Sequence, residues 1–378
     1  MASVASTRSL EVPFLDLTPV NAAVKEDVLA AASGLIDRNE FGSGAAVQAF
    51  EGEFAAYCES AYAVGLASGL DALRLALLAL GIGRGDEVVV PANTFVATFE
   101  AISQTGARPV VADVSEDDDN IDAAAAEAAV TKRTRAILPV HLYGQMANVV
   151  ALEALASARG LTLVEDACQA HGARRDGVRA GSAGRAAAFS FYPAKNLGAM
   201  GDAGALVTDD SELAERVCAL REHGQRAKYR HDFEGFTSRL DALQAAVLSV
   251  KLRQLDSWNQ SRQDAASVYL AELEGLGDLR LPPIARGSIP VWHLFVVRTG
   301  ARAQLQEFLS RQGIQTGRHY PEPPHLSPAY RWLGYGIGSF PVAEAVSRDG
   351  LSLPLFPGMT EEQLETVTEA IKEFFARG

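Results

Sequence analysis

The 378-residue chain is longer than the roughly 250–300 residues over which one hydrophobic core usually extends, so we expect at least two structural units. Its formal net charge of −13 argues against a nucleic-acid-binding protein, which needs a basic surface, and its 48% hydrophobic content is that of an ordinary globular protein. Its three cysteines lack zinc-ligand or disulfide spacing and no apolar run approaches the ~18 residues of a membrane span, so we expect a soluble cytoplasmic protein without a metal site. Residues 1–8 have the composition of a disordered tail, and helices are predicted at 19–33 and 47–57.

The next predicted helix, at 70–80, consists almost entirely of Ala and Leu, so we expect it to be buried. Ser68 can cap this helix, with Asp71 three residues further on as in a capping box. The N–H groups at a buried helix N-terminus need hydrogen-bond partners. A phosphate held at Ser68-Gly69 and a plain serine cap explain these residues equally well.

Strands then alternate with helices as far as residue 164. The predicted strands are apolar and lie at 87–90, 109–112, 136–140 and 161–164, with helices between them at 96–104, 123–130 and 149–158. Apolar strands that alternate with helices indicate a parallel sheet covered on both faces. In such sheets, ligands bind beyond the carboxyl ends of the strands. The polar clusters at these ends, among them Asn93-Thr94-Phe95 and Glu165-Asp166, are therefore candidate site residues.

A lysine follows the next apolar strand. The segment AAAFSFYPAKNLGAMGDAGALVT predicts a strand that ends at Ser190, an irregular glycine-rich loop that contains Lys195, and a second strand. Irregular loops between buried strands carry chemistry more often than they merely connect elements. Most lysines, however, are simply exposed surface residues. The interpretation of Lys195 therefore depends on the partners that the fold brings to it.

The residues at the strand ends are those that a pyridoxal phosphate site needs. A carboxylate such as Asp166 pairs with the pyridinium nitrogen of this cofactor, and a lysine of lowered pKa such as Lys195 forms the Schiff base. Backbone and hydroxyl donors at Ser68-Gly69 bind the phosphate, and a flat side chain such as Phe95 stacks on the ring. Each residue alone has a plain structural explanation, as a turn acid or a core aromatic. Their joint placement at one edge of the sheet is what indicates the cofactor.

The C-terminal part of the chain predicts a second, smaller α/β unit. Its elements are a helix at 212–220, a long and mostly helical segment at 240–273, a strand at 291–297, and helices at 303–312 and 361–376. The basic and aromatic segment His223–Arg239 is interpreted as an exposed excursion. We place the domain boundary near residue 250, which gives a large domain at 1–250 and a small domain at 251–378.

Six segments, which together span the chain from about residue 12 to residue 375, carry a family resemblance. They are SGLDALRLALLALGIGRGDEVVVPANTF, ILPVHLYGQ, LVEDACQAHGA, FSFYPAKNLGAMGDAGALVT, SRLDALQAAVL and TGRHYPEPPHLSPAY. The chain resembles the DegT/DnrJ/EryC1/StrS aminotransferases, which aminate nucleotide-linked keto sugars. The resemblance implies a fold-type I aminotransferase, similar to aspartate aminotransferase, with a mostly parallel seven-stranded sheet and a smaller C-terminal α/β domain. The implied cofactor is pyridoxal 5'-phosphate, with pyridoxamine 5'-phosphate as the intermediate form.

The resemblance also implies roles for individual residues. Lys195 matches the Schiff-base lysine, which argues against the dehydratase branch of the family, where histidine stands at this position. The other cofactor residues are Asp166 at the pyridine nitrogen, Gln169 near the 3-hydroxyl, Ser190 and the Ser68-Gly69-Leu70 turn at the phosphate, and Phe95 on the ring. The residues expected to face the substrate are Tyr192, Asn196, His319 and Tyr320.

The segment before SRLD in this family crosses to the active site of the other subunit, so the resemblance implies a homodimer with two shared sites. Thr237 stands where family members usually carry an asparagine that reaches the neighbour's phosphate, and Leu70 stands where threonine is common. A threonine hydroxyl supplies one donor rather than the two of an amide, so we expect this phosphate contact to be made differently or through water. A floppy surface loop is the alternative interpretation of His223–Arg239.

The implied reaction transfers the amino group of glutamate to a nucleotide-linked keto-6-deoxysugar, with Lys195 as general base and acid. Carbon C-3 of a TDP-linked sugar is favoured, because TGRHYPEPPHL is similar to members that act there. The alternatives are amination at C-4 and amination of a UDP-linked 2-acetamido-3-keto sugar.

Two other functional classes stay open, namely a non-catalytic regulator and a different fold-type I reaction such as decarboxylation. The presence of both Lys195 and Asp166 argues against the regulator.

Overall fold

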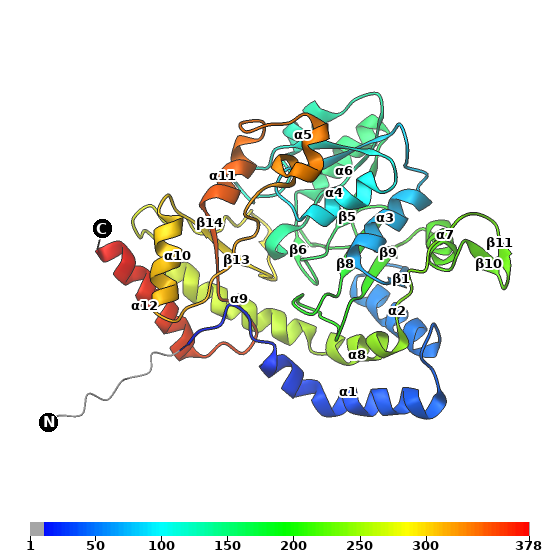
Figure 1. Cartoon of the computed structure of the whole chain (residues 1–378), viewed down its shortest axis with the longest axis horizontal. Coiled ribbons are helices and arrows are strands. Elements are labelled where there is room, and N and C mark those ends of the chain that lie inside the picture. The colour runs from blue at the N-terminus through cyan, green and yellow to red at the C-terminus, as the bar shows by residue number, and fades with distance from the viewer. Residues whose placement is uncertain (1–10, 378) are drawn as a thin grey trace.

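The computed structural model describes residues 11–377, and the tail predicted at 1–8 lies outside them. A seven-stranded sheet forms the centre of the molecule, in the order β1-β9-β8-β5-β4-β2-β3 (Figure 1). In that order its strands are Tyr62–Leu66, Gly204–Thr208, Ala186–Ser190, Thr162–Asp166, Thr134–Ile137, Glu87–Pro91 and Arg108–Ala112. Strand β9 runs antiparallel to β1 and β8, and the other neighbouring strands are parallel. The predicted α/β fold with a mostly parallel seven-stranded sheet is confirmed.

Helices cover both faces of the sheet, because its strands contribute apolar side chains to hydrophobic cores on both sides. Ala186 and Ala188 of β8 belong to one hydrophobic core, and Ala187 and Phe189 belong to another on the opposite face. The helices on the first face are α3 (Gly69–Ala79), α4 (Val96–Ser103) and α7 (Ser211–Arg221). Those on the second face are α2 (Ala45–Tyr57), α5 (Ala123–Ala129), α6 (Val149–Arg159) and α8 (Ala242–Leu252). The long helix α1 (Thr18–Arg38) packs on the outside of α8.

Two local predictions are wrong. Ser68 caps α3, since its Oγ accepts the Asp71 N–H at 3.1 Å, but the carboxylate of Asp71 binds Arg74 and Ser238 at 2.6 Å each instead of completing a capping box. The strand predicted at 136–140 ends as β4 at Ile137, and Val140 makes only an isolated bridge. Pro139 lies between them and lacks the N–H that a strand needs for continued pairing.

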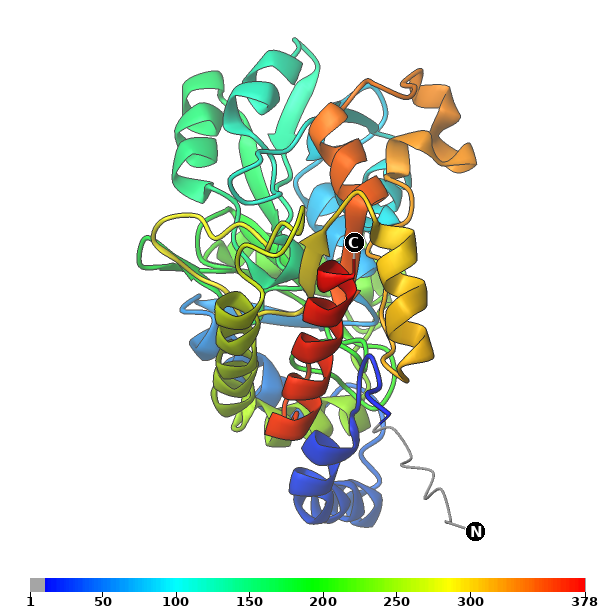
Figure 2. The same ribbon diagram turned by 90° about the vertical axis from the view of Figure 1, so that its left-hand side faces the viewer.

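The C-terminal unit has a hydrophobic core of its own. The main elements of this unit are α9 (Leu255–Glu272), β13 (Phe295–Arg298), α10 (Arg302–Arg311), α11 (Pro341–Asp349), β14 (Gly350–Leu353) and α12 (Glu361–Ala376). Helices α9, α10 and α12 pack around the β13–β14 pair (Figure 2). The strand predicted at 291–297 is thus shorter and begins later. Val12 is buried in this same core, so the start of the described chain packs on the C-terminal unit, and the division at residue 250 stays a prediction.

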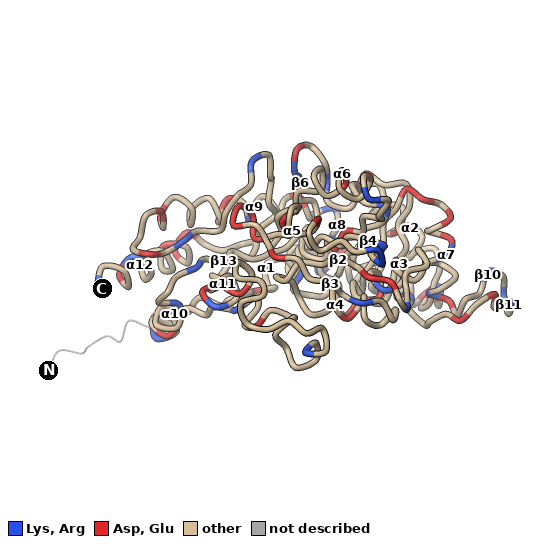
Figure 3. Tube along the Cα trace, turned by 90° about the horizontal axis from the view of Figure 1, so that it is seen from above, with Lys and Arg blue, Asp and Glu red and all other residues tan. Residues whose placement is uncertain are grey.

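Most of the segment His223–Arg239 is exposed or partly exposed, as predicted, although Ser238 is buried. It contains a short hairpin of β10 (Gln225–Ala227) and β11 (Arg230–His231), whose connecting residue Tyr229 is 82% exposed. The hairpin projects from the end of the molecule opposite to the C-terminus (Figures 1 and 3). A further small sheet is formed by β6 (Arg174–Arg175), β7 (Val178–Arg179) and β12 (Ser288–Ile289). Within residues 11–377, no helix combines the length and apolar character needed to cross a membrane.

Candidate active site

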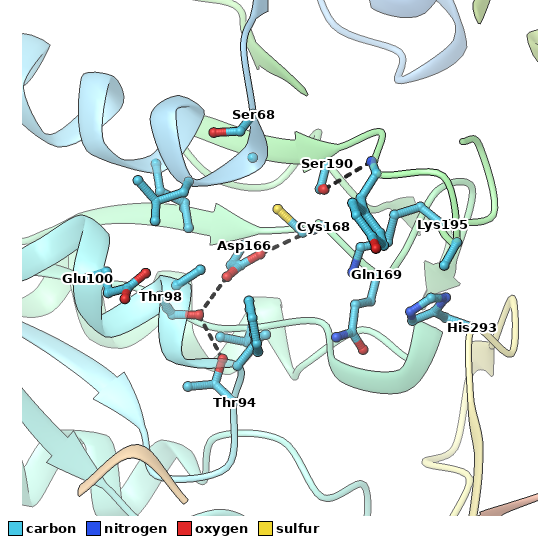
Figure 4. Close-up of a pocket in the computed structure, with 18 of the residues that line it drawn as sticks. Ser68, Thr94, Thr98, Glu100, Asp166, Cys168, Gln169, Ser190, Lys195 and His293 are labelled. Atoms are coloured by element: carbon cyan, nitrogen blue, oxygen red, sulfur yellow. Dashed lines mark hydrogen bonds between the residues drawn. The ribbon is translucent and has the colours of Figure 1, made fainter. Parts of the chain in front are cut away.

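A cavity of about 470 Å³ opens at the edge of the sheet where β1, β2, β5 and β8 end (Figure 4). Most of the predicted site residues line it. They are Ser68, Gly69, Leu70, Phe95, Asp166, Gln169, Ser190, Tyr192, Lys195, His319 and Tyr320. They come from five separate segments of the chain, and the carboxyl ends of parallel strands are where an α/β sheet gathers such residues.

Lys195 lies in the loop between β8 and β9, with its side chain directed into the cavity (Figure 4). Its backbone N–H donates to the carbonyl of Tyr192 at 2.8 Å, which closes a tight turn at the end of the strand. Burial lowers the pKa of the Lys195 ammonium, although the charge of Asp166 acts in the opposite direction. A lysine whose pKa is lowered by burial spends more time as the neutral amine, which is the nucleophilic and proton-accepting form.

Asp166 is buried at the end of β5 and is held by hydrogen bonds on both carboxylate oxygens. Oδ2 accepts the hydroxyl of Thr98 at 2.8 Å, and Oδ1 accepts the backbone N–H of Cys168 at 3.2 Å. The hydroxyls of Thr94 and Thr98 lie 2.7 Å apart and extend this network (Figure 4). The carboxylate is therefore fixed in orientation and is suited to pair with a protonated ring nitrogen.

The preceding residue, Glu165, points away from the cavity because side chains alternate along a strand. Its carboxylate accepts the backbone N–H groups of Gly181, Ala183 and Gly184, and it binds Nε2 of His141 at 2.8 Å. Burial alone would raise the pKa of Glu165, but these hydrogen bonds lower it. Of the predicted Glu165-Asp166 cluster, only Asp166 lines the cavity, and Glu165 anchors a structural turn.

The side wall of the cavity is built around Gln169. Its Oε1 accepts the N–H of Tyr143 at 2.9 Å, and its Nε2 donates to the hydroxyl of Tyr320 at 3.0 Å. The rings of Phe95 and Tyr320 lie 5.2 Å apart at a tilt of 36°. Phe95 is 49% exposed, so one face of its ring is free to stack on a planar group in the cavity.

The opposite end of the cavity forms a cradle of small residues at the N-terminus of α3. A Cβ on Gly69 would lie 2.7 Å from Sγ of Cys168 and 2.8 Å from Cβ of Ser190, so only glycine fits there. A Cβ on Gly204 would overlap the carbonyl of Ser68, which brings β9 directly against the same turn. Helix N–H groups and hydroxyls that converge in this way bind phosphate.

The residues present therefore fit pyridoxal phosphate. The cradle at Ser68-Gly69 would hold the phosphate, and Asp166 would pair with the ring nitrogen. Lys195 would reach the aldehyde carbon, and Phe95 would lie on the ring. These assignments rest on the joint geometry of the cavity, which places an amine, a fixed carboxylate and a phosphate cradle around one space.

Two predicted site residues do not line this cavity. The amide of Asn196 is buried, and its Nδ2 donates to Oδ1 of Asn259 and to the carbonyl of Val291. Thr237 is exposed, and its hydroxyl lies 3.2 Å from Nε2 of His223. Neighbouring residues in an irregular loop point in different directions, so Asn196 faces the protein interior although it is adjacent to Lys195 in the sequence. Thr237 lies in the segment for which a role in a partner's site was predicted.

The cavity also contains residues that the sequence did not indicate. These are Leu73, Ala97, Thr98, Glu100, Val140, Cys168, Ala194, Asp202 and His293, whereas Thr94, which also lines the cavity, belongs to the predicted Asn93-Thr94-Phe95 cluster. Thr98 lies in the first turn of α4 and Thr94 lies just before the start of that helix, so the two hydroxyls meet at 2.7 Å. His293 is surrounded by apolar residues in the sequence, and no local pattern distinguishes it from a core histidine.

The chain matches the model of the DegT/DnrJ/EryC1/StrS aminotransferase family over residues 22–372. It is 50% identical, over 97% of both chains, to the dTDP-3-amino-3,4,6-trideoxy-alpha-D-glucose transaminase of Streptomyces venezuelae.

The similar solved structures include the following two. One is S. venezuelae DesV in complex with a ketimine intermediate, with a TM-score of 0.95, 50% identity and coverage of 97% of this chain and 99% of that one. The other is NtdA of Bacillus subtilis with bound cofactor PMP, with a TM-score of 0.91, 32% identity and coverage of 98% and 86%. The chain therefore belongs to the DegT/DnrJ/EryC1/StrS family and is a sugar aminotransferase that uses pyridoxal phosphate as its cofactor.

Proposed function

We propose that the protein transfers the amino group of glutamate to carbon C-3 of a dTDP-linked 3-keto-6-deoxyhexose. The observation that carries the proposal is the cavity itself, in which the free amine of Lys195 and the fixed carboxylate of Asp166 lie around one space. The identity to a dTDP-3-amino sugar transaminase supports C-3 over C-4 and dTDP over UDP. The cavity is also lined by His319 and Tyr320, which would face the sugar or its phosphates.

Different residues of the cavity have different roles in amine transfer. Pyridoxal phosphate, when bound, supplies an electron sink for the charge that develops at the reacting carbon. Asp166, held by Thr98, keeps a proton on the ring nitrogen so that the sink remains effective. Nζ of Lys195 takes a proton from the carbon that bears the amine of glutamate, and in the second half-reaction it returns a proton to C-3 of the sugar. Its lowered pKa suits it to both directions of this transfer.

Regiochemistry is tested by running the reaction in reverse with 2-oxoglutarate and three amino sugars. The substrates are a dTDP-3-amino-3,6-dideoxyhexose, its 4-amino isomer and a UDP-linked 2-acetamido-3-amino sugar, and glutamate is the measured product. We expect kcat/KM for the 3-amino sugar to exceed the others by roughly 100-fold, because a carbon that bears its amine at another position cannot place its hydrogen within reach of Nζ of Lys195 while the nucleotide stays bound. Equal or faster turnover of the 4-amino isomer would contradict the C-3 assignment.

We propose further that the protein is a homodimer in which His223–Arg239 of one subunit completes the site of the other. Three observations support this. The segment projects from the body of the subunit (Figure 1), its Thr237 is exposed, and Thr237 does not line the cavity of its own chain. A hydroxyl in that position can donate to a phosphate across a two-fold axis.

Subunit complementation tests this arrangement. Lys195→Ala removes the amine of one site, and Thr237→Asp places a negative charge next to the phosphate of the neighbouring site. Each variant alone is expected to be inactive, whereas a mixture after subunit exchange should regain about a quarter of wild-type activity. Half of the dimers are then mixed, and each mixed dimer has one intact site. A mixture as inactive as its components would show that Lys195 and Thr237 serve the same site from the same chain.

A further inference from the structure

His293 lines the cavity beside Lys195 but was given no role above (Figure 4). It precedes β13 and belongs to the C-terminal unit, so it reaches the cavity from a different part of the chain than the cofactor residues do. A contact of this residue with the substrate rests on the proposed sugar aminotransferase function.

The hydrogen bonds behind His293 fix which of its ring nitrogens carries a proton. Nδ2 of Asn259 donates to the carbonyl of His171 at 2.8 Å, so Oδ1 of Asn259 faces Asn196. Nδ2 of Asn196 donates to this Oδ1 at 2.9 Å and to the carbonyl of Val291 at 2.8 Å. Carbonyl oxygens only accept, so neither amide can be turned round without losing these bonds.

Oδ1 of Asn196 therefore faces His293, at 3.3 Å from Nδ1. An amide oxygen is an acceptor, so Nδ1 of His293 must carry the proton. In the neutral imidazole, Nε2 is then an unprotonated acceptor. Within the described chain Nε2 has no hydrogen-bond partner, and the ring lines the cavity.

We propose that Nε2 of His293 accepts a hydrogen bond from a hydroxyl group of the substrate sugar that lies next to the reacting carbon. Nucleotide-linked hexoses carry such hydroxyls, and each is a donor that must find an acceptor when the sugar leaves water. His293 discriminates in this way between sugars that present a hydroxyl to it and those that do not, which makes it a residue of substrate specificity.

The surroundings of His293 keep its ring neutral, as the proposal requires. Burial lowers the pKa of His293 well below its usual value, and the positive charges of Lys195 and Arg262 lower it further. Arg262 is itself buried, where it donates to the carbonyls of Trp292 and Leu355. A protonated imidazole would also lose its acceptor lone pair, so the neutral form is the one that can receive a hydroxyl.

Two substitutions separate substrate contact from a purely structural role. His293→Asn retains a donor close to the position of Nδ1 and can still bind Asn196, but it has no group at the position of Nε2. His293→Gln places an amide oxygen close to the position of Nε2 and loses the bond to Asn196. We expect His293→Asn to lower kcat/KM for the sugar by about tenfold to a hundredfold through KM, and His293→Gln to stay within roughly fivefold of wild type.

The glutamate half-reaction serves as the internal control. It is followed by the spectral change of the bound cofactor without any sugar, and it should proceed at wild-type rate in both variants. The sugar assays use whichever nucleotide sugar the wild-type enzyme accepts, so a wrong assignment of the carbon or the nucleotide leaves this test intact. Loss of wild-type turnover with every sugar, alongside a working glutamate half-reaction, would instead refute the proposed function.

A second measurement keeps the comparison independent of turnover. Calorimetric binding of the amino-sugar product should weaken in His293→Asn and be retained in His293→Gln, while melting temperatures show which variant is less stable. The opposite order, with His293→Gln impaired in both binding and stability and His293→Asn normal, would show that His293 only holds Asn196 in place and would overturn the proposal.

Discussion

Lys195→Ala is expected to lower turnover by at least ~10⁴-fold while the protein remains folded. The substitution removes both the covalent attachment of the cofactor and the base that moves the proton, and general acid–base catalysis alone contributes up to about 10⁴-fold. The fold should persist because the amine of Lys195 makes no hydrogen bond within the described chain, and the loop is held by backbone bonds such as Lys195 N–H to Tyr192.

The measurement combines turnover with mass spectrometry after borohydride reduction. Reduced wild-type protein should gain the mass of the cofactor on the peptide that contains Lys195, and the variant should not. Lys132→Ala is the matched control, because Lys132 is exposed in the turn that precedes β4, at the end of the strand remote from the cavity. Near-native turnover of Lys195→Ala would refute the assignment.

Asp166→Asn is expected to slow both half-reactions by roughly 10²–10³-fold while the cofactor stays bound. Asparagine has nearly the same shape: its Oδ1 can accept the N–H of Cys168 while its Nδ2 donates to the hydroxyl of Thr98, so both contacts are kept and only the direction of the second is reversed. It lacks the negative charge that keeps the ring nitrogen protonated, and removing one preorganised electrostatic partner from a buried site costs a factor of that order.

Stopped-flow absorbance during the glutamate half-reaction measures this effect directly. Cofactor content after dialysis should equal that of the wild type, because Lys195 and the phosphate cradle are untouched. Asp117→Asn, at an exposed aspartate, should behave as the wild type. A variant of Asp166 that loses its cofactor altogether, or one that is fully active, would assign the carboxylate to a different role.

The parts of the site that were predictable from sequence are those fixed by local pattern. Apolar strands alternating with helices place Asp166 and Ser190 at one edge of the sheet, and the structure has both residues there. The serine cap at Ser68 depends only on neighbouring residues, and its hydrogen bond is present. Such features follow from chain geometry over a few residues, which composition and spacing specify well.

The parts that were not predictable depend on packing between distant segments. Thr98 acquires its role only because α4 lies beside the end of β5, 68 residues away in sequence. His293 comes from the C-terminal unit and differs from a core histidine only through the amide relay behind it. Asn196 adjoins the lysine in sequence yet points into the protein, because the loop turns between the two residues.

The close contact between Gly204 and the carbonyl of Ser68 restricts which residues of the site can be substituted. This contact fixes the distance between the lysine loop and the phosphate cradle. Any side chain at residue 204 would therefore displace the loop that carries Lys195 relative to the turn at Ser68. By contrast, His293, His319 and Tyr320 reach the cavity from the C-terminal unit, and His293 and Tyr320 contact the cofactor side of the cavity through hydrogen bonds to Asn196 and Gln169. We therefore expect that C-terminal segments can be exchanged to alter sugar preference with the amine chemistry intact, provided that these two hydrogen bonds are kept.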